Sequence, residues 1–310
     1  MVKAAYSIRV LAVLVAVLVL WSSAFAGIRA GLKAYSPGQV ALFRFLIASA
    51  ALAMYAGIAR FRRPALRDLP WLATAGLVGI AFYNLALNWG QTRVSAGAAS
   101  LLIASTPIWT TILAMIGLGE RLTPLGWCGI GASFVGVGVI AQAEGEGLHF
   151  SVQALVILAA AISSGVYNTL LKHFVGRYSA LECTAYSIWF GTALMAPWGG
   201  GLAHAVRTAP LNATLAIVYL GVFPASIAYV GWAYLLSHGQ AGRTSTFLYL
   251  TPVLAIAIAW IWLGEIPKML SMIGGAIALC GVVLVHVWGG GGTEKNEAIA
   301  GHGVPDGCRN

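Results

Sequence analysis

The sequence predicts an all-α integral membrane protein: ten transmembrane helices, arranged as two inverted five-helix repeats around a central cavity. Three observations lead to this fold class. Only 9% of the 310 residues are charged, 59% are hydrophobic, and the mean hydropathy is +0.84, which leaves too little polar surface for a soluble domain. Apolar runs long enough to span hydrocarbon recur along the chain. Motifs of the first half recur in the second half.

Ten apolar segments are predicted to cross the bilayer as helices, because none shows the strand-like alternation of a membrane barrel. The first follows Lys3 and Arg9 as a signal peptide would, but no cleavage site leads into a polar mature chain, so it is predicted to be a retained span. The connections are short and polar or rich in Pro and Gly. The spans cover residues 8–28, 37–59, 70–90, 95–117, 124–142, 152–172, 179–198, 211–235, 241–263 and 267–288.

Basic residues in the connections predict the orientation. With the N-terminus in the cytoplasm, twelve Lys and Arg residues fall inside and five outside, as the positive-inside rule requires. Both termini are therefore predicted to be cytoplasmic, although Arg29 and Lys33 count against this orientation. The same distribution explains the net charge of +9 through topology, so the lipid bilayer rather than nucleic acid is the expected partner.

The internal repeat is visible as exact motif matches. A shift of 145 residues places Thr106-Pro107 on Thr251-Pro252, and Leu118-Gly119-Glu120 on Leu263-Gly264-Glu265. Each copy holds five spans, an odd number, so the second copy must enter the membrane from the opposite side. The predicted domains are residues 1–145 for the first repeat, 146–288 for the inverted second repeat and 289–310 for a disordered cytoplasmic tail.

Motifs in the first half resemble a known family. Trp21-Ser22-Ser23-Ala24-Phe25, Arg44-Phe45 and the run from Thr106-Pro107 to Gly119-Glu120 are similar to those of the drug/metabolite transporter superfamily, EamA type, and the resemblance covers residues 8–288. It implies a ten-helix basket in the bacterial inner membrane that exports small metabolites, commonly amino acids. Among its members, the chain most resembles bacterial aromatic-amino-acid exporters. Arg44 has no basic counterpart in the second copy, where Ser187 stands, so its role is not duplicated.

Twelve residues are predicted to line the substrate path. Asn84 and Asn88 share one helical face with Gln91, and amides that face lipid are costly, so this face points to a cavity or to another helix. Aromatic rings attract an ammonium group, whereas hydroxyls and amides bind its carboxylate, which suits a zwitterion. Ordinary packing and interhelical hydrogen bonding are the alternatives for each. The candidates are Trp21, Ser22, Phe25, Tyr83, Asn84, Asn88, Trp109, Ser164, Tyr167, Asn168, Tyr229 and Tyr249.

Two mirrored pairs of residues predict bends. Pro107 and Pro252 occupy equivalent positions in spans 4 and 9, and each removes a backbone donor from its helix. Gly79 and Pro224 are the equivalent pair in spans 3 and 8. Because bends at matched depths suit a motion shared by both copies, we expect these four residues to act as hinges, with static kinks as the alternative.

Three charged residues within or beside the spans are predicted to be structural or gating. Arg44 is an intramembrane cation and so a functional candidate, but a structural role through snorkelling or pairing is favoured over substrate binding. Glu120 and Glu265 end spans 4 and 9 on opposite membrane faces, where capping or gating at the rim is expected.

Small residues in spans 5 and 10 predict close helix packing. Ala132 and Gly136 are four residues apart, as are Gly274 and Ala278. This spacing fits packing within one chain and packing at a dimer seam equally well, so both a monomer and a homodimer are compatible with it.

A secondary carrier that exports amino acids or related metabolites by alternating access is the predicted function. A nucleotide-sugar or other metabolite exchanger of the same superfamily is the closest rival, but it would need basic residues for phosphate, and only Arg44 lies within a span. An intramembrane enzyme is disfavoured because Asp68 and Asp306 lie outside the spans and the histidines lack ligand spacing, so no catalytic residue, metal site or cofactor is predicted. A channel would need a filter-like run or a ring of like charges.

Overall fold

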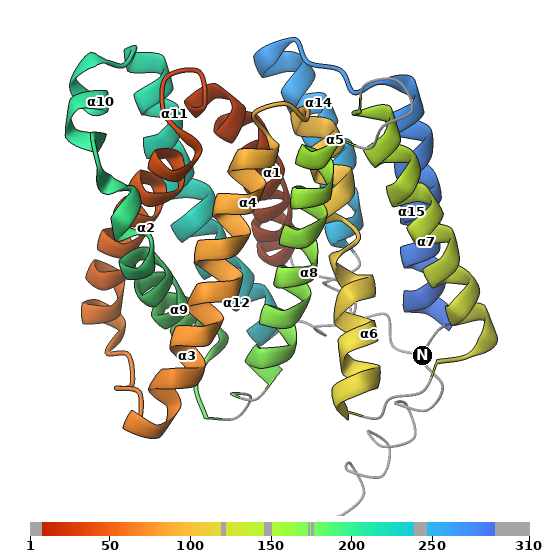
Figure 1. Cartoon of the computed structure of the whole chain (residues 1–310). Coiled ribbons are helices and arrows are strands. Elements are labelled where there is room, and N and C mark those ends of the chain that lie inside the picture. Colours follow the sequence, from red (N-terminus) through yellow and green to blue (C-terminus); the bar gives the residue numbers. More distant parts are fainter. Residues whose placement is uncertain are drawn as a thin grey trace, which may run out of the picture.

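The protein is a bundle of helices that run close to one common direction (Figure 1). The computed structural model describes residues 8–118, 122–145, 151–172, 174, 177–238 and 247–288. Eight of its helices are long and apolar enough to cross a membrane, and Phe247–Leu263 forms a shorter apolar helix. Large apolar side chains such as Met54, Ile116 and Ile261 are exposed on the outside, as a lipid-facing surface requires. The predicted all-helical membrane fold is confirmed.

The first half contains five spans, two of which are built from more than one helical segment. Its elements are α1 (Ile8–Gly31), α2 (Pro37–Ala59), η1 (Leu66–Asp68), α3 (Leu69–Ala75), η2 (Gly76–Phe82), α4 (Tyr83–Gly90), α5 (Ala96–Ile103), α6 (Thr106–Leu118) and α7 (Pro124–Ala143). The third span joins α3, η2 and α4, and the fourth joins α5 and α6.

The second half repeats this plan. Its elements are α8 (Val152–Lys172), α9 (Ala180–Leu194), η3 (Ala196–Gly199), α10 (Leu202–Thr208), α11 (Leu211–Val222), η4 (Phe223–Ile227), α12 (Ala228–His238), η5 (Phe247–Leu250), α14 (Thr251–Leu263) and α15 (Met269–Trp288). The seventh span is shorter than predicted, since α9 ends before Pro197 and a tight turn follows. The short helix α10 lies in a connection and was not predicted.

The two halves run in opposite directions through the molecule. Helix α1 finishes at the end of the bundle that carries Glu265, because Arg29 in its last turn pairs with Glu265. Helix α4 ends there too, since Gln91, which follows it, donates to the Phe25 carbonyl. Helix α8 begins at this same end, since a Cβ at Gly90 would touch the Gln153 carbonyl. We call this the Glu265 end and the opposite one the Arg62 end. The first helix of each half therefore points the opposite way, which confirms the inverted repeat.

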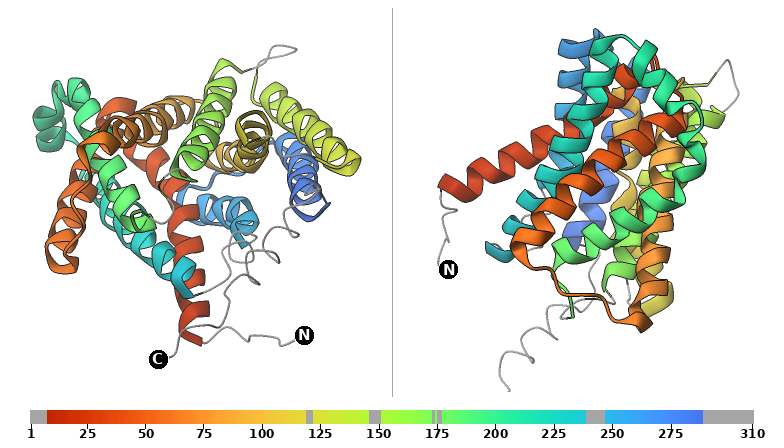
Figure 2. Two further views of the ribbon diagram at one scale, coloured as in Figure 1. Left: turned by 90° about the horizontal axis from the view of Figure 1, so that it is seen from below. Right: turned by 90° about the vertical axis from the view of Figure 1, so that its left-hand side faces the viewer.

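Helices of the two halves are interleaved rather than separated. Helix α4 and the π-helix η2 pack against α8 and α9, α11 packs against α2, and α1 packs against α14 and α12. The view along the bundle shows this mixing, with orange α3 beside green α9 and golden α5 between α8 and the blue helices (Figure 2). The interior is thus lined by both copies, as a site between repeats requires.

Helices α7 and α15 pack closely against each other, and small residues make this possible. A Cβ at Gly136 would collide with backbone atoms of Gly274 and Ala278, and one at Gly129 would meet the Gly281 carbonyl. The Ser133 hydroxyl bonds to the Ala278 carbonyl across the same seam. The predicted small-residue packing therefore occurs within one chain, between its fifth and tenth spans.

The α7–α15 seam gives a paired test of packing. We expect Gly136→Ala to lower the free energy of unfolding by about 1–3 kcal/mol, because the added methyl overpacks a backbone contact. Gly131→Ala is the matched control on the same helix, since a Cβ there has open space around it. Thermal unfolding in detergent should separate the two variants, and equal unfolding temperatures would contradict the tight seam.

Candidate functional site

Aromatic and polar side chains from both repeats meet inside the bundle around one cation. The Arg44 guanidinium of α2 lies within electrostatic range of Tyr83 and Tyr229, and Tyr167 lies within range of Tyr229. The Trp21 ring meets the Tyr229 ring edge-on, with centroids 5.6 Å apart. We call this set the central cluster, and its members are Trp21, Arg44, Tyr83, Asn84, Tyr167 and Tyr229.

Arg44 is held deep in the protein. Only 7% of its surface is exposed, and its Nη1 reaches Asn84 Oδ1 at 3.5 Å. Its guanidinium also lies 5.2 Å from the centre of the Phe45 ring. It therefore pairs with a neighbouring helix instead of snorkelling to the membrane surface. Sequence reasoning ranked it as structural, without predicting that it would contact the candidate Asn84.

Two π-helices at mirrored positions position much of this cluster. Gly79 lies in η2 and Pro224 in η4, which are the repeat-equivalent bends. A π-helix has wider turns than an α-helix, so some backbone carbonyls lose their usual N–H partner. Here, side chains donate hydrogen bonds to several of these carbonyls. Trp21 Nε1 donates to the Pro224 carbonyl at 3.2 Å, and Asn84 Nδ2 donates to the Ile80 carbonyl at 2.8 Å. The bends thus fix the side chains that surround Arg44.

Gly79 is needed for a close approach between the repeats. A Cβ at this position would overlap the Tyr167 ring of α8. The neighbouring Ser163 hydroxyl of α8 donates to the Val78 carbonyl at 2.7 Å. Together these contacts place Tyr167 against the bend of the third span, with its hydroxyl lacking a hydrogen-bond partner of regular geometry.

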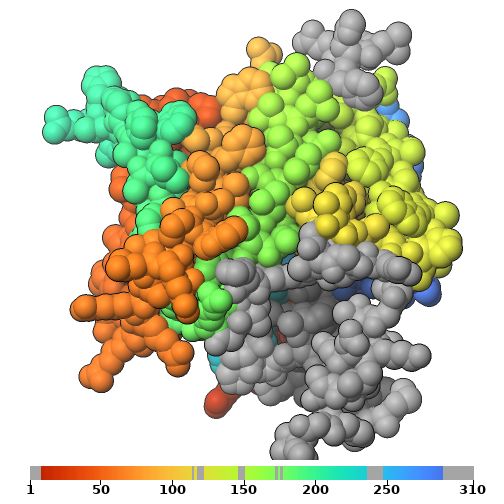
Figure 3. All heavy atoms as spheres, turned by 60° about the horizontal axis from the view of Figure 1, so that its bottom comes forward, coloured from red at the N-terminus to blue at the C-terminus, as the bar shows by residue number. Residues whose placement is uncertain are grey.

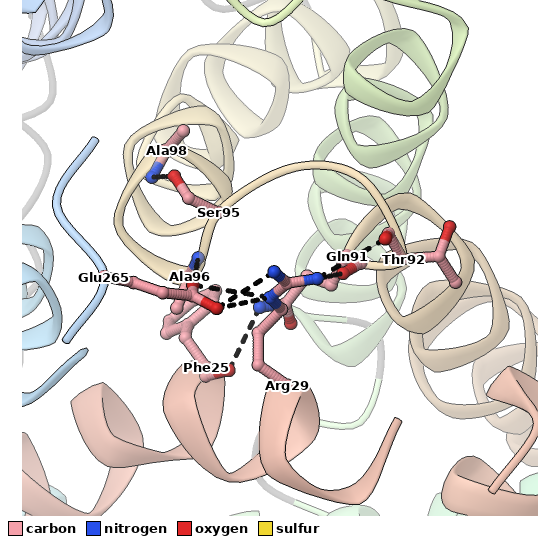
Figure 4. A network of polar contacts seen from close by, with 8 residues as sticks. All are labelled: Phe25, Arg29, Gln91, Thr92, Ser95, Ala96, Ala98 and Glu265. Carbon is pink, nitrogen blue, oxygen red and sulfur yellow. Dashed lines mark hydrogen bonds and ion pairs between the residues drawn. The ribbon is translucent and has the colours of Figure 1, made fainter. Parts of the chain in front are cut away.

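At the Glu265 end, an ion pair joins α1 to the segment that follows α14 (Figure 4). Arg29 Nε donates to Glu265 Oε1 at 3.0 Å, and its Nη2 lies 2.9 Å from the same oxygen. Arg29 Nη1 also donates to the Gln91 carbonyl at 2.7 Å. Glu265 Oε2 accepts from the backbone N–H of Ala96 at 3.3 Å. We call this network the latch, because it ties four segments from both repeats.

Helix ends explain why these charges suit the latch. Glu265 sits at the N-terminus of α5, where a carboxylate is favoured, and Arg29 contacts carbonyls that follow the C-terminus of α4, where a cation is favoured. Gly264 adopts φ 68°, which ends α14 and turns the chain into Glu265. Arg29 was missed as a functional residue because it had been counted only as an exception to the charge rule.

The Arg62 end holds a cavity of about 740 Å³. Its walls come from the end of α2 and the following segment, from residues 177–182 and from α12. Hydrogen bonds brace these walls: Tyr178 donates to Asp68 at 2.8 Å, and the Arg62 N–H donates to Glu182 at 2.7 Å. Figure 3 shows this side, where orange atoms of the first half lie against green atoms of the second.

Three further candidates are buried, two of them in α1 and one in α4. Ser22 is fully buried and its hydroxyl has no partner. Phe25 is buried in the main apolar core, and its backbone carbonyl accepts the bond from Gln91. Asn88 donates to the Pro37 carbonyl at 3.1 Å, so it links α4 to the start of α2. Asn88 thus forms an interhelical hydrogen bond, which was the alternative to lining a cavity.

None of the described contacts of four other predicted lining residues is with a member of the central cluster. Trp109 packs edge-on against Phe134 of α7, and Tyr249 packs against His286 of α15. Ser164 is partly buried on α8, beside the point where that helix packs against α6, and Asn168 is exposed further along α8. The structure does not bring these four residues to Arg44.

The predicted proline hinges lie at breaks between helical segments. Pro107 is the second residue of α6, and Pro252 is the second residue of α14. Each helix has 13 residues and begins with the Thr-Pro motif, so the repeat holds in structural detail. Glu120, predicted as the counterpart of Glu265, lies outside the described residues.

An inverted pair of five-span repeats, breaks at mirrored positions and a polar cluster between the copies are the architecture of a membrane carrier. The chain belongs to the EamA-like transporter family, whose model matches residues 8–142 and again residues 152–287. Both repeats thus carry the family pattern.

Named relatives include several exporters. The chain is 41% identical to a probable terminal-alkyne amino-acid exporter of Streptantibioticus cattleyicolor, over 88% of this chain and 92% of the relative. It is 26% identical to a probable amino-acid metabolite efflux pump of Escherichia coli, over 88% of this chain and 93% of the relative. A solved crystal structure is similar in fold, with a TM-score of 0.59 at 22% identity, covering 89% of this chain and 96% of that one.

Proposed function

We propose that this protein is a secondary exporter of amino acids or related small metabolites in the bacterial inner membrane, working by alternating access. The central cluster carries this proposal, because aromatic rings, an amide and a guanidinium from both repeats converge inside the bundle. Such groups bind a small zwitterion without requiring a phosphate. The exporter names of two relatives support the same substrate class.

The described conformation fits one state of such a cycle. The latch closes the Glu265 end, while the cavity of about 740 Å³ lies at the Arg62 end. In the orientation that the basic residues predict, the Arg62 end faces the cytoplasm, so the state is closed to the outside. Breakage of the latch, with hinge motion at the mirrored bends near Gly79 and Pro224, would give the opposite state. The repeat makes Glu120 the equivalent closing residue for the cytoplasmic end.

Transport in liposomes tests the substrate class. We expect purified protein to move labelled neutral amino acids, and Asn84→Ala to slow this movement roughly tenfold, because a hydrogen bond to a charged group is lost. Trp21→Ala should also slow it, through loss of an aromatic wall. Trp127→Ala, on the exposed face of α7, is the control and should retain full flux. Wild-type liposomes that match empty ones across an amino-acid panel would refute the assignment.

Cysteine labelling tests the orientation. Lys33 and Arg60 are both exposed and lie at opposite ends of α2. In a cysteine-free background, a membrane-impermeant maleimide applied outside cells should label Lys33→Cys and spare Arg60→Cys until the membrane is opened. Labelling of both residues from one side would rule out the proposed topology.

The latch predicts a measurable shift between states. Glu265→Gln removes the ion pair, whose side chains are only 26% and 22% exposed, and we expect roughly a tenfold gain in the outward-open population. A cysteine at Ser22, which is fully buried, should then react faster with an external maleimide. Glu144→Gln is the matched control, because Glu144 bonds to Ser271 at the same end, between α7 and α15. Equal labelling rates in both variants would show that the latch does not gate this end.

A further inference from the structure

Arg44 keeps unused hydrogen-bonding capacity in the interior of the protein. Its Nε has no partner, and its one side-chain hydrogen bond, to Asn84, is long at 3.5 Å. A guanidinium offers five N–H donors and stays charged in proteins. Within the ranges that the structure describes, the ion pairs join Arg29 to Glu265 and Arg177 to Asp68, so no carboxylate there pairs with Arg44. A buried cation in this condition is short of an anionic partner.

The backbone around Arg44 is fixed, so the guanidinium is presented from a rigid base. A Cβ at Gly221 would meet the Arg44 carbonyl and the Ile47 side chain, which shows how closely α11 packs on α2. On the other side, Asn84 is oriented by its own bond to the Ile80 carbonyl, so its Oδ1 points to Arg44. A preorganised cation loses little freedom on binding a ligand.

The groups beside Arg44 come from equivalent places in the two repeats. A shift of 145 residues places Asn84 on Tyr229; Asn84 bonds to the guanidinium, and Tyr229 packs against the apolar cluster that includes Phe45 of the same helix. Tyr83 and Tyr229 both lie deep in the bundle yet retain some accessible surface, so the space around them is not completely filled. The Ser22 hydroxyl has no partner, and the Tyr167 hydroxyl lacks a hydrogen-bond partner of regular geometry. Both repeats therefore contribute buried hydroxyls with spare hydrogen-bonding capacity to this part of the interior.

We propose that Arg44 binds the carboxylate of the transported amino acid. A carboxylate accepts parallel N–H bonds from one edge of a guanidinium, and the Nε of Arg44 has no hydrogen-bond partner here. The substrate ammonium group then faces the Trp21 and Tyr229 rings, which attract a cation. This assignment rests on the proposed function and names the part of the substrate that is recognised. One carboxylate needs only one cation. This agrees with the second repeat, which has the uncharged Ser187 at the position equivalent to Arg44.

Matched ligands test this role directly. Purified protein in detergent is titrated calorimetrically at pH 6 with L-phenylalanine and with its primary amide, since both amines are protonated there. The wild-type protein should bind the acid about 10- to 100-fold more tightly than the amide, as expected for hydrogen bonds to a charged group. Arg44→Gln should bring this ratio close to one, through loss of acid binding alone. Arg44→Lys should give an intermediate ratio.

A second variant keeps the test valid if Arg44→Gln does not fold. Asn84→Asp places a carboxylate beside the guanidinium and supplies the missing partner from within the protein. We expect it to unfold at a temperature no lower than the wild type and to lose the preference for the acid. A preference for the acid that persists in Asn84→Asp would count against Arg44 as the carboxylate site.

A third probe, 3-phenylpropanoate, separates this proposal from the proposed function. If the wild type binds 3-phenylpropanoate but no amino acid, and Arg44→Gln does not bind it, the carboxylate site stands while amino-acid transport fails. Equal wild-type affinity for acid and amide, a preference that persists in either variant, or binding of none of the three probes would overturn the assignment.

Discussion

Hydrocarbon offers no hydrogen bonds, so each backbone group that leaves the regular helix ladder needs a partner from elsewhere in the protein. This constraint explains many of the interior polar contacts. Trp21 serves the Pro224 carbonyl in one π-helix, and Asn84 serves the Ile80 carbonyl in the other. At the Glu265 end, Gln91 and Arg29 do the same for helix-end carbonyls. The breaks in the helices and the interior polar side chains therefore depend on each other. At both π-helices, a side chain donates a hydrogen bond to a backbone carbonyl.

The same constraint separates satisfied polar atoms from unsatisfied ones. The amide nitrogen of Asn88 is used by the backbone and is explained by the fold, whereas its Oδ1 is buried without a partner. The Nε of Arg44 is likewise buried without a partner, and unlike the amide oxygen it belongs to a cationic group. Burial without a partner costs free energy, so the fold tolerates it best where a ligand supplies the bond for part of the cycle.

Much of the fold could be predicted from the sequence, because motif register and span length are local properties of the chain. The Thr-Pro register correctly gave two equivalent helices, and Gly79 with Pro224 marked the mirrored breaks. The π-turns themselves were not predictable, since their width depends on packing against Tyr167 and Trp21. The Arg29–Glu265 pair was also missed, although topology places both residues at one end. The partners lie 236 residues apart, and only the packing of α1 on α14 brings them together. The site residues away from Arg44 show the same limit, as Trp109 faces α7 for reasons of packing.

The two repeats are equivalent at their bends but differ at Arg44, which is present in the first repeat alone, and these two features have different consequences. Under the proposed alternating access, the mirrored bends would be equivalent hinges in the two copies, so an exchange of their conformations would exchange the open end. A binding group used in both states must stay with the substrate during that exchange, and a single residue between the copies satisfies this condition. Arg44 is such a residue, because it contacts Asn84 of the first repeat and lies beside Tyr229 of the second. Since these neighbours are repeat equivalents, their exchange leaves a polar group next to the guanidinium in either state. An unpaired cation on one copy is thus compatible with a symmetric mechanism, whereas a second cation at position 187 would leave one charge without a ligand in every state.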